Sequence, residues 1–171
     1  MSISALRLRA PLLFSALLCA GLAHAATQAA APAEQAAPFD ELTAEQWKAQ
    51  AADLLNQAKA SPSGMASVTL KKYPGHFTML TVRTRSGGAE QHDHAADIFI
   101  VLDGEATEVT GGSIENASTA KPGETRGTRV VGGTEHRMQT GDIVHIAPGT
   151  PHQTLVAPGK TFTYYVIKVD Q

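Results

Sequence analysis

The stretch QHDHAADIFIVLDG, at residues 91–104, places two histidines and an aspartate directly before an apolar strand and a tight turn. Side chains alternate between the two faces of a strand, so His92 and His94 are expected to project together. Two such imidazoles can bind one metal ion, because neutral imidazole is a common ligand of first-row metals. Taken alone, the pair is also compatible with two exposed polar histidines.

A second stretch, GDIVHIAPGTPH at residues 141–152, also leads from a turn through an apolar strand, and it ends at His152 after a Pro-Gly-Thr-Pro turn. Together the two stretches resemble the two sequence motifs of the cupin family. The first motif is matched in order by Gly88, His92, His94, Asp97 and Gly104. The second is matched by Gly141, Pro148 or Ala147, Gly149 and His152. The resemblance covers residues 64–171.

This resemblance implies an all-β fold, a double-stranded β-helix (jelly-roll) barrel with one divalent metal ion inside its mouth. It implies that His92, His94, Asp97 and His152 face that ion. The family's acidic ligand is usually a glutamate separated from the second histidine by three or four residues. Here only Ala95-Ala96 separate His94 from Asp97. Asp97 is therefore expected either to bind the ion directly or to support the three histidines from beside it.

Short segments rich in Val, Ile, Thr and aromatic residues alternate with Gly, Pro, Asp and Asn, which predicts many short strands in a sandwich or barrel. The predicted strands are 66–73, 76–85, 97–103, 105–110, 128–133, 135–139, 142–147, 152–157 and 161–169. The polar stretch 111–127 is predicted to be a long loop. One helix is predicted over 44–60, where Thr43 and Gln46 form a capping box.

The N-terminal end has the features of a signal peptide. Arg7 and Arg9 precede a short apolar run, and Ala23-His24-Ala25 offers a small-x-small cleavage site. The predicted parts are a signal peptide at 1–25, a flexible linker at 26–40, a helix region at 41–62 and a barrel domain at 63–171. The expected location is periplasmic or secreted. An uncleaved N-terminal anchor is the alternative.

Composition narrows the chemistry. The only cysteine, Cys19, lies in the predicted signal peptide, so the mature protein is expected to have no thiolate ligand or cysteine nucleophile. The formal net charge is −2, without a basic patch, which argues against nucleic acid as a partner. No membrane contact is expected after signal cleavage. The ligand types suit manganese, iron, zinc, nickel or copper, and they do not distinguish among them.

Two further residues are candidates for catalysis. His145 lies on the predicted strand before the Pro-Gly-Thr-Pro turn and could act as a proton shuttle. Tyr164 lies on the last predicted strand and could donate a hydrogen bond to a bound molecule.

Three functions remain open at this point, because the fold does not determine the reaction. The first is a metal-dependent oxidoreductase, isomerase or lyase acting on a small oxygen-rich molecule, such as a sugar, a hydroxy acid or a phenolic. The second is a non-catalytic periplasmic protein that binds a metal or a small molecule. The third is an accessory domain that docks through its N-terminal helix. The resemblance also makes a homodimer plausible.

Overall fold

The computed structural model describes residues 39–171, which form one α-helix and twelve β-strands. The predicted signal peptide and nearly all of the predicted linker lie outside these residues. The helix is α1 (Ala44–Ala60). The strands are β1 (Met65–Tyr73), β2 (His76–Arg83), β3 (Ala89–His92), β4 (Ala95–Thr110), β5 (Ser113–Glu115), β6 (Ser118–Lys121), β7 (Glu124–Gly127), β8 (Arg129–Val131), β9 (Thr134–Gln139), β10 (Ile143–Ile146), β11 (His152–Leu155) and β12 (Phe162–Asp170).

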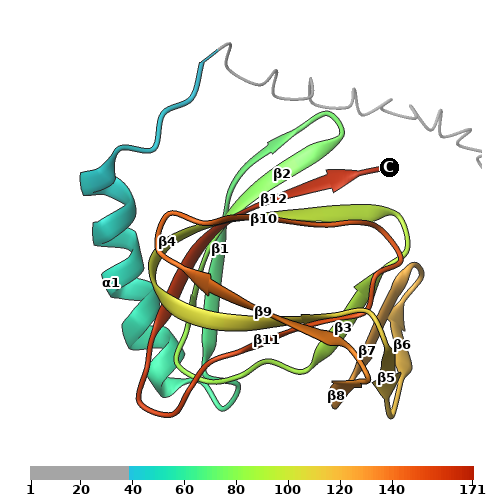
Figure 1. Ribbon diagram of the computed structural model, residues 1–171. Helices are drawn as coiled ribbons and strands as arrows, with labels where there is room; N and C mark the ends of the chain where they lie inside the picture. Colours follow the sequence, from blue (N-terminus) through green and yellow to red (C-terminus); the bar gives the residue numbers. More distant parts are fainter. Residues whose placement is uncertain (1–38) are drawn as a thin grey trace, which may run out of the picture. The chain divides into compact units, whose positions relative to one another are not determined.

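The strands form two facing antiparallel layers, as the resemblance implied (Figure 1). The first layer contains β1, β2, β12, β10 and the first half of β4. The second contains β9, β11, β3, β7, β6 and the second half of β4. The short strands β5 and β8 form a separate pair. The chain is therefore all-β apart from α1, with space for a site between the layers.

Strand β4 joins the two layers. The sequence predicted two strands here, but residues 95–110 are one continuous strand whose halves pair with different partners. Gly104, at the junction, has a φ of 86°, a conformation that side chains disfavour. A Cβ at this position would also collide with the carbonyl oxygen of Thr161. The change of layer therefore depends on a residue without a side chain.

We expect Gly104→Ala to lower the free energy of unfolding by about 3 kcal/mol, as measured by urea denaturation. The positive φ costs roughly 1–2 kcal/mol for a residue with a Cβ, and the collision with backbone adds to this cost. Gly111→Ala is the matched control, because Gly111 has a φ of 78° and a Cβ added there would meet nothing within 4 Å. Equal losses in the two variants would show that packing against residue 161 is unimportant.

The prediction of a long loop at 111–127 was wrong, since β5, β6 and β7 lie in this stretch. All four residues of β6 are exposed, so no alternation of polar and apolar residues marks the strand. These strands matter for the site because β7 pairs with β3 along its whole length.

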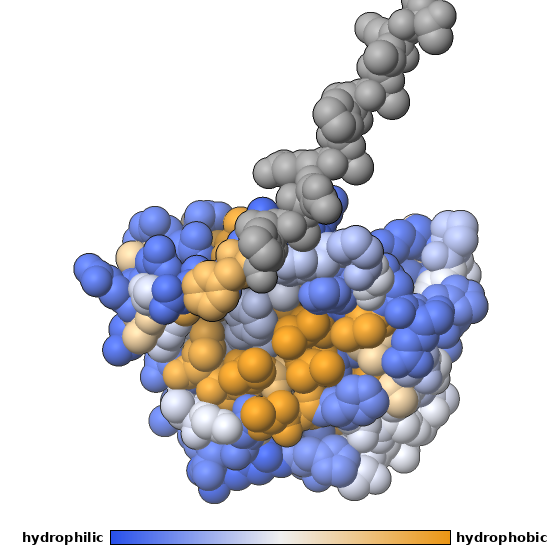
Figure 2. Space-filling view, turned by 90° about the horizontal axis from the view of Figure 1, so that it is seen from above, coloured by the Kyte–Doolittle hydropathy of each residue, from blue (hydrophilic) through white to orange (hydrophobic). Residues whose placement is uncertain are grey.

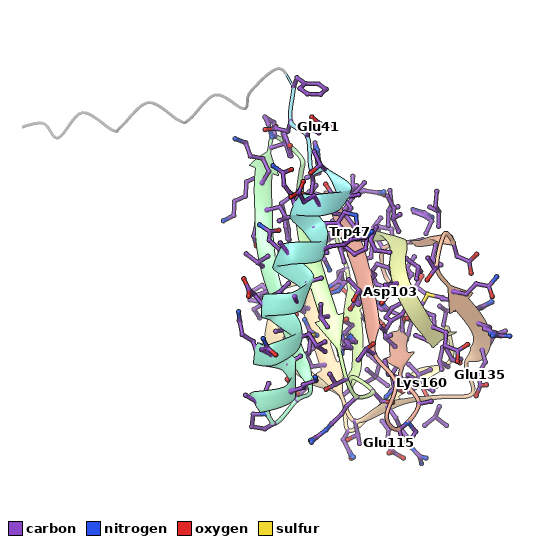
Figure 3. The ribbon with its side chains drawn as sticks, turned by 90° about the vertical axis from the view of Figure 1, so that its left-hand side faces the viewer. Glu41, Trp47, Asp103, Glu115, Glu135 and Lys160 are labelled. Carbon is purple, nitrogen blue, oxygen red and sulfur yellow. The ribbon has the colours of Figure 1, made fainter. Side chains whose placement is uncertain are left out.

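The main apolar core lies between the layers, and Phe99, Met138 and Phe162 are among its most buried members. A second cluster lies where α1 packs on the outer side of β2, with Leu54 and Ala58 against Leu80 and Val82. Figure 3 shows α1 lying along the strands, with Trp47 at their side of the helix. The predicted capping box is present, with the Thr43 and Gln46 side chains each bonded to the other's backbone.

Outside α1, the outer side of the first layer carries apolar side chains. Ile143 on β10 lies opposite Ile100 on β4, and Ile143 is 71% exposed. Figure 2 shows an apolar area on the face seen from above. Among the residues described, no helix is both long and apolar enough to cross a membrane.

Candidate metal centre

Four ionisable side chains from both layers converge between them. Glu90 and His92 lie two residues apart on β3 and therefore point to the same side. His152 begins β11 and lies opposite Glu90 in the antiparallel register. Asp97 comes from the first half of β4 and is 3% exposed. Both motif stretches thus contribute to one site.

The separations within this cluster are nearly uniform. Nε2 of His92 lies 3.5 Å from Oε2 of Glu90 and 3.5 Å from Oδ2 of Asp97. Nε2 of His152 lies 3.6 Å from Oε1 of Glu90 and 3.5 Å from Oδ2 of Asp97. One potential ligand atom from each of Glu90, His92 and His152 lies within 4.8 Å of the others.

This spacing suits a divalent ion. Nitrogen and oxygen ligands about 2.1 Å from a tetrahedrally bound ion lie about 3.4 Å from one another. The Nε2 atoms of His92 and His152 are also buried without a hydrogen-bond partner among the described residues. Buried polar atoms are seldom left without partners, so a ligand for these two nitrogens is expected. The cluster therefore fits the ion that the sequence predicted.

The tautomer of His152 suits metal binding. Its Nδ1 lies 2.9 Å from the carbonyl oxygen of Thr150, which can only accept a hydrogen bond. Nδ1 therefore carries the hydrogen in the neutral ring, and the lone pair of Nε2 faces the cluster. The Pro-Gly-Thr-Pro turn thus orients the ligand that follows it. The same turn is joined to β3 by a backbone hydrogen bond, in which the Gly149 amide donates to the His92 carbonyl at 2.7 Å.

Lys168 on β12 stands behind Asp97. Its Nζ donates a hydrogen bond of 3.0 Å to Oδ2 and lies 2.7 Å from Oδ1, the latter as an ion pair without hydrogen-bond geometry. The ammonium therefore partly neutralises the carboxylate nearest to both histidines. Asp97 can contribute to an ion through Oδ2, but it does so in competition with Lys168.

The charges of the cluster shift its pKa values strongly. Burial by itself lowers the pKa of His92, but the carboxylates of Asp97 and Glu90 outweigh it and raise that pKa to about 9. Burial by itself raises the pKa of Glu90, yet contact with His92 and His152 brings it down to about 2. The same two histidines hold the pKa of Asp97 well below its usual range against the effect of burial. A metal ion would have to displace the His92 proton, so its affinity should fall as the pH falls.

His94 is not part of this cluster. Strand β3 ends at His92, so the alternation expected across 92–94 does not continue, and the exposed His94 lies in the turn before β4. Glu90 takes the place that His94 was expected to fill, and sequence reasoning missed it. The spacing contained a signal for this arrangement. If His92 is taken as the second ligand in place of His94, four residues separate it from Asp97. This lies within the usual separation in the family, so the spacing is no longer too short.

The two predicted catalytic residues lie on opposite sides of the first layer of strands. His145 is exposed on β10 and pairs with Ile98, an outward-facing position. Tyr164 is 3% exposed and lines the cavity together with His92 and Asp97. Its ring packs against Phe99 at a centroid distance of 4.9 Å. Only Tyr164 is therefore placed to contact a molecule at the cluster.

The cavity at the cluster has a volume of about 270 Å³ and opens between the layers. Apolar side chains, among them Phe77, Met79 and Phe99, form one part of its wall. Charged groups form the rest, and the β6–β7 hairpin contributes Lys121, Glu124 and Arg126. This volume and this mixed lining suit a small polar molecule.

No protein-family model and no curated protein matches the sequence. Solved structures do match the fold. A cupin 2 conserved barrel domain protein from Salinispora arenicola is 20% identical, over 66% of this chain and 83% of its own, with a TM-score of 0.45. An uncharacterized conserved protein with a double-stranded beta-helix domain from Klebsiella pneumoniae is 15% identical, over 64% and 80%, with a TM-score of 0.48.

A recombinant oxalate oxidase in complex with glycolate is 16% identical, over 65% of this chain, with a TM-score of 0.47. The match spans about half, 53%, of that enzyme's chain. The fold itself is the two-layered antiparallel barrel that follows from the pairing of this chain's own strands. At these identities the similarity concerns the arrangement of strands alone, and it does not carry over an activity or a substrate. The chemistry of this barrel has to be argued from its own residues.

Proposed function

We propose that the protein is a metal-dependent enzyme that acts on a small oxygen-rich molecule, such as a sugar, a hydroxy acid or a phenolic. The ion is held by His92, His152 and Glu90, with Oδ2 of Asp97 as a further ligand. One observation carries the proposal. Two buried imidazole nitrogens without hydrogen-bond partners in the described residues lie 3.5–3.6 Å from two carboxylates, at the spacing of ligands around one ion.

A bound ion would supply a Lewis acid that polarises a substrate oxygen or a bound water. The chain's own residues orient the reaction. The hydroxyl of Tyr164 accepts a hydrogen bond of 2.9 Å from Nε of Arg83, which leaves its own hydrogen available to donate into the cavity. Lys168 neutralises part of the Asp97 charge and so limits the negative charge around the ion.

A non-catalytic metal-binding or small-molecule-binding protein is the second candidate function. The position of His145 favours it, because one of the two predicted catalytic groups lies on the outer side of the barrel, away from the cluster. A binder needs the same ion and cavity but no group that transfers a proton.

The first test is the metal content of protein lacking residues 1–25, purified without chelator and without an affinity tag rich in histidine. Mass spectrometry should find about one first-row metal ion per chain. If the protein carries no ion and takes up none of manganese, iron, zinc, nickel or copper, the proposal fails. The loaded protein is then incubated with sugars, hydroxy acids and phenolics, and product formation is followed by NMR. Saturable binding without any product would support the second candidate.

The proposed location is the periplasm or the exterior of the cell, which rests on the features of residues 1–25. The homodimer expected from the family resemblance stays a prediction.

A further inference from the structure

A buried arginine, Arg83, lines the same cavity as the candidate metal ligands Glu90, His92 and Asp97. It is the last residue of β2 and is only 8% exposed. Its Nε donates to the hydroxyl of Tyr164 at 2.9 Å. Among residues 39–171, no carboxylate oxygen lies within 4.0 Å of its guanidinium nitrogens. Burial by itself lowers the pKa of Arg83, and Glu90 and Glu108 raise it only from beyond that distance. A buried charge without a directly paired opposite charge is unfavourable, so an anionic partner in contact with this side chain is expected.

The other charges of the cavity are already paired. Four cationic and three acidic side chains line it, with Arg83 among the cations. Lys168 pairs with Asp97, Arg126 with Glu90, and Lys121 with Glu124. Arg83 is therefore the cation left over, and a divalent ion would make the wall still more positive. Such a wall attracts an anion.

The neighbouring backbone leaves room for the Arg83 guanidinium. A Cβ on Gly87 would lie 3.1 Å from Cζ and 3.2 Å from Nη2 of Arg83, closer than side chains normally approach. The lack of a side chain at residue 87 thus lets the guanidinium occupy its place at the wall. Tyr164, which Arg83 contacts through Nε, lines the cavity beside the candidate metal ligands. Arg83 therefore lies between the cluster's cavity and a neighbouring pocket that Gly87 lines, and its contact with Tyr164 places it at the cluster's cavity.

We propose that Arg83 binds a carboxylate group of the substrate, while the ion at the histidine cluster binds another oxygen of the same molecule. This inference rests on the proposed metal-dependent function and narrows it to carboxylic acids, such as hydroxy or oxo acids. A guanidinium presents donors in a planar fork that matches the two oxygens of a carboxylate. A cavity of about 270 Å³ suits an acid of a few carbon atoms.

The probe is a matched pair, L-lactate and L-lactamide, which differ in the carboxylate and have nearly the same size. Each is titrated into zinc-loaded protein and followed by NMR chemical shifts. We expect lactate to bind at least ten times more tightly than lactamide, because only lactate offers an anionic partner to Arg83. Equal affinities overturn the inference. Binding of inorganic phosphate in preference to lactate overturns the assignment to a carboxylate.

Variants of Arg83 test whether this side chain causes the difference in affinity. Arg83→Met should weaken lactate binding at least tenfold and leave lactamide binding unchanged, and Arg83→Lys should recover only part of the loss, because an ammonium lacks the planar fork. Arg137→Met is the control, since Arg137 is 72% exposed, pairs with Glu105 and does not line the cavity. Unchanged lactate affinity in a folded Arg83→Met variant overturns the inference. If Arg83→Met does not fold, Arg83→Lys decides it, because lactate whose carboxylate is bound by zinc alone would keep its full affinity in that variant.

The zinc content of every sample is measured separately, so the two proposals fail in different ways. If protein without zinc still prefers lactate, and this preference depends on Arg83, the metal-dependent function is overturned and the carboxylate site stands. If the protein carries about one zinc per chain but shows no preference for lactate, the metal site stands and the role of Arg83 is overturned.

Discussion

Replacement of His152 with alanine is expected to lower the affinity of the protein for a divalent ion by at least about a hundredfold. His152 is 2% exposed, its Nε2 lacks a hydrogen-bond partner among the described residues, and Thr150 fixes its ring. Loss of a group that merely supports a ligand costs about 10–100-fold in affinity, so loss of the ligand itself should cost no less. Competition with a chromophoric zinc chelator measures the change. His92→Ala should behave in the same way.

His94→Ala is the matched control, and it separates the two possible ligand sets. His94 is exposed in the turn between β3 and β4, so its removal should leave the affinity for zinc unchanged. Glu90→Gln should reduce the affinity, since Glu90 lies 3.5 Å and 3.6 Å from the two imidazoles. Loss of zinc in His94→Ala together with normal affinity in Glu90→Gln would reinstate the ligands expected from the sequence.

Glu108→Gln is expected to make the protein more stable than the wild type at pH 8 by about 3 kcal/mol, and no more stable at pH 4. Glu108 is fully buried on β4, and burial raises its pKa from 4.5 to about 7, although Thr154, His152 and Arg83 favour the charged form. The unfolded chain loses this proton near pH 4.5 and the folded protein near pH 7. Protonated Glu108 therefore makes its full contribution to the free energy of unfolding below pH 4.5, and this contribution is lost as the pH rises to about 7.

Urea denaturation at a series of pH values, with a chelator present, tests this prediction. Glutamine has the shape of protonated glutamate and keeps an oxygen that can accept the 2.7 Å hydrogen bond from Oγ1 of Thr154. Because Glu90 and His152 titrate in both proteins, the difference between variant and wild type isolates Glu108. Glu135→Gln is the control, as Glu135 is exposed on β9 (Figure 3). A constant difference between pH 4 and pH 8 would contradict a raised pKa at Glu108.

Much of the fold follows from local sequence. The capping box and the apolar spacing predicted α1 at the residues where it occurs, because these signals act within a few turns of one helix. Strands such as β2 and β12 were predicted for a similar reason, since segments rich in Val, Thr and aromatic residues between turn residues are a local signal. The polar hairpin of β6 and β7 was missed because its strands form by pairing with each other and with β3, not by burying apolar side chains.

The sequence by itself predicted an all-β barrel from its many short strands and close turns. Its resemblance to the two cupin motifs implied that His92, Asp97 and His152 lie near one another. Only the tertiary structure decided that Glu90 and not His94 joins them. The reason is that β3 ends at His92, and where a strand ends depends on its partners β7 and β11, which lie far along the chain. The sequence also could not show that Arg83 lacks a directly paired carboxylate. Whether a buried charge is paired depends on all the neighbours that folding brings to it.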